Sequence, residues 1–204
     1  YRWEYATAIA CARIGVNAFD QPNVQESKTI AKQKIAGYKK AGFIEDGQAI
    51  WENDQAVLYG KPVDGLSRAT YLAQALECYL KQIQSNGFVA INAYLPRLPN
   101  TEHDLQTVRG KILDATHSAT TLGFGPRFQH STGQFHKGGF EGGLFIQITR
   151  EVQHDLMIPE EGMSFGTLQK AQAVGDLDAL LERGKLAVRV HLKRGQIRDL
   201  VHGS

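Results

Sequence analysis

The chain has 204 residues, of which 42% are hydrophobic and 22% are charged, a composition typical of a soluble globular protein with one or two compact units. Its 23 basic and 21 acidic residues are spread along the chain and give a net charge of +2, which argues against a nucleic-acid partner. No apolar run approaches the roughly 20 residues needed to cross a bilayer, and the amino terminus lacks a leader pattern. A cytoplasmic location without a membrane partner is therefore expected.

The first part of the sequence predicts helices around one polar loop. Residues 1 to about 14 carry apolar side chains at helical spacing, and Gly15 ends this helix. Because the helix begins without an initiator methionine, a piece of a longer polypeptide is expected. After the loop, Pro22 begins a second helix that runs to about Lys40 and is stopped by Gly42. Two short apolar runs between 48 and 59 predict a hairpin at the surface, and a third helix is predicted over about 65–84.

From residue 88 onward, strands and helices alternate. Strands are predicted at 88–95, 120–124, 144–149 and 186–190, and helices at 102–117, 130–137 and 165–183. The last strand alternates apolar and polar residues like a half-exposed edge strand, and the polar tail from Lys193 is expected to fray. The pattern predicts an α/β fold: a parallel sheet of about four strands with right-handed crossover helices. The predicted division is a helical segment over 1–85 and an α/β domain over 86–204.

Two stretches of this sequence carry chemistry. In the first, a polar loop enters a helix with Asn17, Phe19, Asp20 and Gln21 at its start and Lys28 two turns in. It resembles the loop and lysine near the carboxyl terminus of phosphoglucose isomerases, and the longer string up to Lys28 looks like the enzymes of this family that are fused to transaldolase. The resemblance implies a catalytic role for Lys28 and substrate binding by Gln21.

The second stretch runs from Gly123 to Gly139. Its glycines do not fit a dinucleotide fingerprint, but a Gly-Pro turn, the cation of Arg127 and a His-Ser pair entering a helix suit an anionic or polyhydroxy ligand. The string from His130 through Ser131 to Gln134 is similar to a motif of compact bacterial phosphoglucose isomerases. The resemblance implies that His130 helps to open the sugar ring, and that Ser131, Gln134 and Arg127 bind substrate. The order of the two motifs is permuted here.

Taken together, the resemblance of the two motifs implies that the chain is the C-terminal part of a glucose-6-phosphate isomerase fused to transaldolase. It also implies an SIS-like doubly wound sheet. Such an enzyme interconverts glucose 6-phosphate and fructose 6-phosphate through an enediol and needs no cofactor. The family's glutamate base and phosphate loop have no counterpart in this chain, so upstream isomerase and transaldolase domains of the parent chain are expected as partners. The isolated chain is then expected to be inactive. Homodimerisation is left open.

Plainer interpretations stay open beside this one. Lys28 could be a solvated helix lysine and His130 a structural histidine bonded to a turn, while an ordinary surface position is expected for His136. The spacing of the histidines predicts no metal site, and the two cysteines, Cys11 and Cys78, are expected to be small buried residues. The main alternative function is a non-catalytic sugar-phosphate-binding module. A purely structural tail and a transaldolase are weaker, the latter because it needs a complete barrel.

Overall fold

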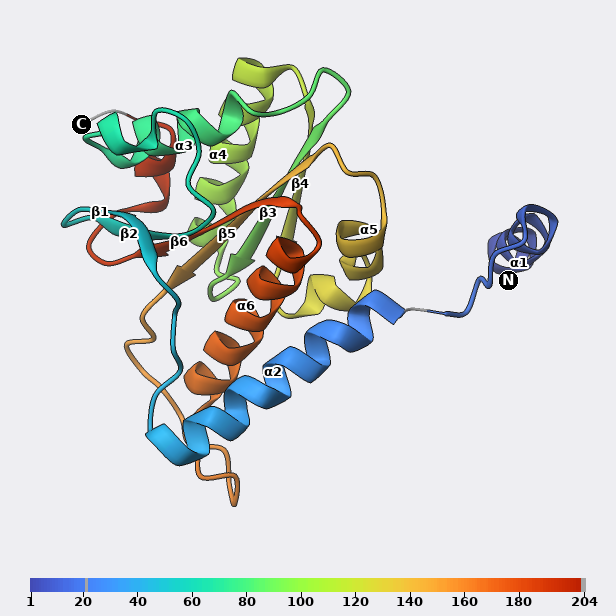
Figure 1. The fold of residues 1–204 in the computed structure, drawn as a ribbon, viewed down its shortest axis with the longest axis horizontal. Coiled ribbons are helices and arrows are strands. Elements are labelled where there is room, and N and C mark those ends of the chain that lie inside the picture. Colours follow the sequence, from blue (N-terminus) through green and yellow to red (C-terminus); the bar gives the residue numbers. More distant parts are fainter. Residues whose placement is uncertain (21, 203–204) are drawn as a thin grey trace.

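The computed structural model describes residues 1–20 and 22–202 and shows an α/β fold on a six-stranded sheet (Figure 1). The strand order is β1-β2-β6-β5-β3-β4. Strands β3, β4, β5 and β6 are parallel, as predicted, but the sheet has six strands and not about four, because β1 and β2 extend it in antiparallel fashion. The bounds are β1 Ala49–Glu52, β2 Ala56–Gly60, β3 Phe88–Tyr94, β4 Ala119–Phe124, β5 Gly143–Arg150 and β6 Leu186–Leu192.

The helices lie close to their predicted positions. Gly15 closes the first helix in the left-handed conformation, with a φ of 74°, as expected of a helix-ending glycine. The third helix is shorter than predicted because a separate 3-10 turn precedes it. The bounds are α1 Arg2–Ile14, α2 Pro22–Ala41, α3 Leu72–Leu80, α4 Pro99–Thr116, α5 Gly133–Gly138 and α6 Phe165–Glu182, with 3-10 turns η1 Leu66–Arg68, η2 Arg127–His130 and η3 Ile197–Leu200.

Helices cover the sheet on both faces, so its central strands are buried as the apolar runs predicted. One face, with α3, α4 and η3 against it, carries the main apolar core. The other face is covered by α6 and, toward β4, by α5, and α2 packs on the outside of α6 (Figure 1). Burial of these apolar side chains supplies the main driving force for this arrangement.

The hairpin and the last strand differ from their predicted places. Strand β2 pairs with β6 along its whole length, so the hairpin is part of the sheet and not a surface excursion. As a result β6 lies inside the sheet, between β2 and β5, and is not an edge strand. The sheet thus draws strands from both predicted segments, 1–85 and 86–204, and the division between them stays a prediction.

The two ends of the chain also differ from expectation in how they pack. The tail does not fray before residue 200, because Ile197 and Leu200 of η3 are buried in the main core. Helix α1, in contrast, stands apart from the sheet and buries none of its residues, including Cys11, which is only partly covered (Figure 1). Cys78 is buried as predicted. Within residues 1–20 and 22–202, none of the helices has the length and apolar character needed to span a membrane.

Candidate functional site

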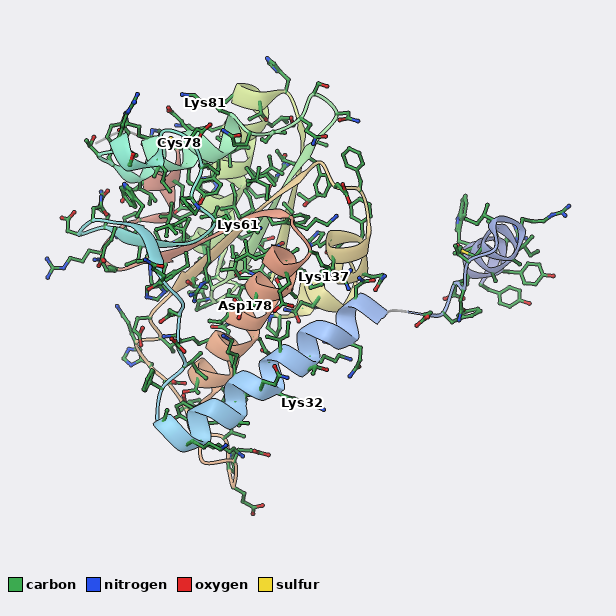
Figure 2. All side chains as sticks on the ribbon, in the orientation of Figure 1. Lys32, Lys61, Cys78, Lys81, Lys137 and Asp178 are labelled. Atoms are coloured by element: carbon green, nitrogen blue, oxygen red, sulfur yellow. The ribbon has the colours of Figure 1, made fainter. Side chains whose placement is uncertain are left out.

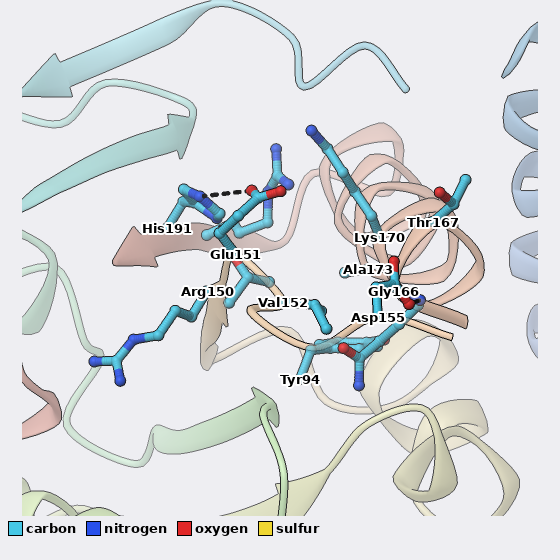
Figure 3. A pocket seen from close by; sticks show the side chains of 13 residues that line it. Tyr94, Arg150, Glu151, Val152, Asp155, Gly166, Thr167, Lys170, Ala173 and His191 are labelled. Carbon is cyan, nitrogen blue, oxygen red and sulfur yellow. Dashed lines mark hydrogen bonds and ion pairs between the residues drawn. The ribbon is translucent and has the colours of Figure 1, made fainter. Parts of the chain in front are cut away.

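A crevice lies where β3 and β5 end, at the carboxyl edge of the parallel sheet. From β3 the chain moves to β4 on one side, whereas from β5 it moves to β6 on the other side. Ligands of open α/β sheets bind at such a reversal of strand order. The cavity here has a volume of about 110 Å³ and is lined from β3, β5, β6 and the first turns of α6 (Figure 3).

The sheet face beneath α6 becomes more polar toward this crevice. Its second row of cross-strand neighbours is apolar, with Ala90, Phe145 and Ala187. The next row holds Asn92, Gln147 and Arg189, and the row at the edge holds Tyr94, Thr149 and His191. Since side chains two residues apart point to the same face of a strand, these polar groups are stacked toward the crevice.

One carboxylate joins two cations at the crevice wall. Asp46, from the loop after α2, accepts a hydrogen bond of 2.8 Å from Nη1 of Arg189 and lies 2.6 Å from Nζ of Lys170. Burial alone would raise the pKa of Asp46, but these two cations lower it below its ordinary value. The guanidinium of Arg189 also lies over the ring of Tyr59, 4.4 Å from its centroid.

The imidazole of His191 lies beside a hydroxyl and a carboxylate. Its Nδ1 is 3.0 Å from Oγ1 of Thr149, and its Nε2 is 3.9 Å from the carboxylate of Glu151, which faces it in Figure 3. Burial, with the neighbouring charge of Arg189, lowers the pKa of His191. The ring is therefore neutral at pH 7 and can donate or accept one hydrogen bond at the crevice.

The start of α6 closes the crevice and is already capped. Ser164 is the N-cap, and its Oγ accepts a hydrogen bond of 3.1 Å from the amide of Thr167. The carboxylate of Asp155 accepts hydrogen bonds from the amides of Leu156 and Gly166, and bonds with Ser164 and these amides lower its pKa. The dipole of α6 thus faces a carboxylate of the chain itself.

A wider cavity adjoins the crevice and shares part of its wall. It has a volume of about 820 Å³ and lies between the segment after β3, the segment after β5 and the first turns of α6. Its lining is largely apolar, and the polar side chains in it include the amides of Gln169 and Gln172 and the ionisable groups of Arg150, Glu151, His154 and Asp155. Cavities with apolar walls and few polar groups are typical of small-molecule sites. Among the apolar side chains that line it are Leu95, Pro96, Leu98, Pro126, Leu156 and Phe165.

A buried ion pair lies deeper on the same face of the sheet. Nζ of Lys137, on α5, donates to Asp176 on α6, and Gln147 of β5 donates to the other carboxylate oxygen at 2.8 Å. Both charged side chains are almost fully buried, and Figure 2 shows Lys137 where α5 approaches α6. Removing one partner of such a pair leaves a buried charge uncompensated, so these residues fix α5 and α6 to the sheet.

His136 is buried, not at the surface as predicted. Its ring lies between Phe128 and Phe145, with centroid distances of 5.6 and 5.1 Å. Burial lowers the pKa of His136 to about 4, opposed by the charge of Asp176 and assisted by that of Lys137. The ring is neutral at pH 7, and its Nδ1 has no hydrogen-bond partner in the described part of the chain.

The two stretches singled out in the sequence meet in the structure. The backbone nitrogen of Asn23, at the start of α2, donates a hydrogen bond of 3.1 Å to Oε1 of Gln134 on α5. The side-chain amides of the two residues also face each other. Their helices approach so closely that a Cβ added at Gly138 would lie 2.8 Å from Oδ1 of Asn23. The start of the lysine helix therefore touches the end of the His-Ser-Thr-Gly-Gln segment at Asn23 and Gln134, and the two segments are together called here the motif surface (residues 23, 25, 28 and 127–134).

The other predicted site residues are less closely joined. Lys28 on α2 and His130 at the end of η2 are exposed. Arg127 and Ser131 line a separate hollow of about 220 Å³ beside β4. Gln21 lies outside the described residues. None of the described site residues lines the crevice at β3 and β5, so the structure holds two separate candidate places for a ligand.

Sequence reasoning missed the crevice, although a signal existed. Asn92 and Gln147 each interrupt an otherwise apolar strand, and Arg189 interrupts a third. Polar residues inside three neighbouring strands indicate a polar patch on the covered face. Among residues 1–20 and 22–202, no three or more His, Cys, Asp or Glu side chains are grouped to hold a metal ion.

Comparison with known proteins adds little to this geometry. No family model matches the chain, and no curated protein matches it. The fold is similar to the crystal structure of a hypothetical protein from Thermus thermophilus, with a TM-score of 0.48 and 19% identity. The similarity covers 63% of this chain, which spans only 36% of that protein's length. A likeness at this level carries no argument about function.

Proposed function

We propose that the chain is the C-terminal part of a glucose-6-phosphate isomerase of the kind fused to transaldolase, with an SIS-like sheet. The observation that carries this proposal is the contact between Asn23 and Gln134, which are 111 residues apart in sequence. It brings together the two stretches that resemble phosphoglucose isomerase motifs. Their exposed groups, Lys28 and His130, are accessible to an upstream domain of the parent.

In this proposal the chain supplies acid-base groups and leaves the carbon chemistry to the parent. His130 transfers a proton to or from the ring oxygen when the cyclic sugar opens, and Lys28 stabilises negative charge that develops on the substrate. The glutamate that moves the proton between adjacent carbons, and the loop that holds the phosphate, belong to the upstream domain. The substrate is glucose 6-phosphate or fructose 6-phosphate, and the setting is the cytoplasm.

The test compares variants in the parent enzyme. Lys28→Ala is expected to lower turnover sharply, whereas Lys32→Ala, an exposed lysine one turn further along the same helix, is expected to leave turnover near the wild-type value. His130→Ala is expected to impair the cyclic substrate much more than the open-chain form, since only the cyclic form must be opened. The isolated chain is expected to be inactive. Equal activity of the Lys28 and Lys32 variants, or robust turnover by the isolated chain, would contradict the proposal.

A further inference from the structure

The first turn of α2 is bonded to a side chain from a distant part of the chain. Pro22 opens the helix and has no N–H, so the amide of Asn23 is the first donor for which the helix itself provides no acceptor. Asn23 is buried, so this amide needs an acceptor from the protein. Its N–H donates to Oε1 of Gln134, 3.1 Å away. The side chain of Gln134 thus satisfies α2 as an N-cap residue usually does from the adjoining sequence.

The element that carries this acceptor is fixed to the core. Gln134 lies on the short helix α5, where its neighbours Gly133, His136 and Lys137 are buried. Lys137 is ion-paired with Asp176 on α6, and the ring of His136 packs between two aromatic rings. Because these side chains hold α5 in one position, the amide of Gln134 presents its oxygen to α2 at a fixed place.

The amide of Gln134 is largely occupied by this contact. A glutamine side chain offers one oxygen and one NH₂ group. The oxygen accepts from the backbone of Asn23, and Nε2 donates to Oδ1 of the same residue. Arg127 and Ser131, in contrast, line the hollow beside β4. The resemblance implies substrate binding for all three residues, but in the structure Gln134 faces α2.

Lys28 lies between two points at which α2 is held. On its amino side Asn23 is bonded to α5. On its carboxyl side Ala31 packs against Gly175 of α6, where an added Cβ would lie 3.0 Å from the backbone of α2. In an α-helix the N–H of residue 28 bonds to the carbonyl of residue 24, so Lys28 depends on an intact first turn. Fraying of that turn would leave the direction of the lysine side chain undefined.

We propose that Gln134 is a positioning residue, which caps α2 and thereby fixes Lys28, and that it does not bind the substrate itself. The cap concerns the fold alone, whereas the effect on Lys28 rests on the isomerase function proposed above. A carboxylate at position 134 would still accept the N–H of Asn23 and would be favoured at the amino end of α2. In one orientation of its amide, Asn23 can also donate to position 134 while its oxygen lies 2.6 and 2.8 Å from the guanidinium of Arg183.

Amide hydrogen exchange of the 204-residue chain, followed by NMR, tests the cap. Gln134→Met removes the acceptor at similar volume, so the amides of residues 23–28 are expected to exchange roughly 5-fold faster or more, while those of α6 keep their rates. Gln134→Glu should leave the rates near those of wild type. If the Met variant does not fold, Gln134→Ala takes its place. Unchanged exchange at residues 23–28 would overturn the cap.

A matched control separates the cap from general loss of a glutamine. Gln129 is half-buried like Gln134, but it donates to the hydroxyl of Tyr94 at 2.7 Å. Gln129→Met should therefore leave exchange in α2 unchanged. Equal acceleration at residues 23–28 in the Gln129 and Gln134 variants would contradict a specific bond to α2.

Kinetics of the parent enzyme with fructose 6-phosphate test the positioning role. Gln134→Met is expected to lower kcat roughly 10-fold with little change in KM, because Lys28 is misplaced, whereas Gln134→Glu should keep kcat and KM near wild type. A substrate ligand would show the reverse order, since a carboxylate there repels the phosphorylated sugar and raises KM.

The possible outcomes distinguish this inference from the proposed function. A Glu variant weaker than the Met variant would overturn the positioning role. So would wild-type kcat in Gln134→Met beside a strong defect in Lys28→Ala, a result that would leave the isomerase function in place. A parent enzyme without isomerase turnover would remove the proposed function and the positioning role together, whereas accelerated exchange at residues 23–28 would still support the cap.

Discussion

At the scale of single residues, buried polar side chains distinguish the two faces of the sheet. The face under α3 and α4 is apolar, whereas the face under α6 holds Lys137, Asp176 and Gln147 in one bonded group. Isolated buried charges are expensive, so their presence requires partners from several elements at once. His136 lies next to Lys137 in sequence, and within residues 1–20 and 22–202 its Nδ1 has no hydrogen-bond partner, so protonation would place an extra charge between two apolar rings.

Stability should therefore fall as the pH drops from about 6.5 to about 4. Burial lowers the pKa of His136 to about 4, so between these values the unfolded chain binds a proton that the folded chain does not. Below the pKa of the folded state, the free energy of unfolding is therefore lower by about 3 kcal/mol than it is above pH 6.5. Urea unfolding of wild type and His136→Phe at several pH values would measure it. The free energy of unfolding of the Phe variant, which keeps an aromatic ring between Phe128 and Phe145, should depend less on pH over this window. The same pH dependence in wild type and variant would contradict a buried neutral imidazole at position 136.

At the scale of elements, local patterns predicted what forms but not where it packs. Helical spacing and apolar runs were sufficient to place α2, α4, α6 and the four parallel strands within a few residues. The pairing of β2 with β6 was missed because those residues are over 120 positions apart, and no local period encodes a partner. Arg189 and His191 made β6 resemble an edge strand, whereas they belong to polar rows on a covered face. For the same reason, His136 could not be recognised as buried from its own neighbours.

Helix α2 depends on a glycine in α6 for its close approach. A Cβ added at Gly175 would lie 3.0 Å from the backbone nitrogen of Ala31, whereas one added at Gly37, on α2, would meet nothing within 4 Å. Leucine improves helix propensity equally at both places. We expect Gly37→Leu to raise the free energy of unfolding by up to about 1 kcal/mol, and Gly175→Leu to lower it by about 1–3 kcal/mol through overpacking. Chemical denaturation measures both; a stabilised Gly175→Leu variant would show that α2 and α6 are not tightly packed.

At the scale of the whole molecule, the two ends of the chain contribute differently to the fold. The carboxyl end returns to the main core through η3, which packs against α3 and α4. The amino end exposes Tyr1, Trp3 and Tyr5 on a helix that buries nothing. A helix of 13 residues without packing is marginal in water, so α1 owes little of its stability to the body of the chain.

Removing the amino end should therefore hardly change the stability of the fold, whereas removing the carboxyl end should lower it strongly. None of residues 1–20 is buried, so a chain that begins at residue 22 should keep its free energy of unfolding within about 0.5 kcal/mol of that of the full chain. A chain that ends at residue 195 loses Ile197 and Leu200, each a buried aliphatic side chain that stabilises by about 1.5–3 kcal/mol. Because natural domains are only marginally stable, this truncation should lower the unfolding midpoint substantially or prevent folding.

The double substitution Ile197→Ala and Leu200→Ala in the full-length chain serves as a milder version that retains the backbone of η3. Unfolding curves followed by tryptophan fluorescence at Trp51, whose Nε1 donates to the carbonyl of Ala69, report on the core without relying on α1. Equal stability of the two truncated chains would mean that η3 is not held in the core as the structure places it.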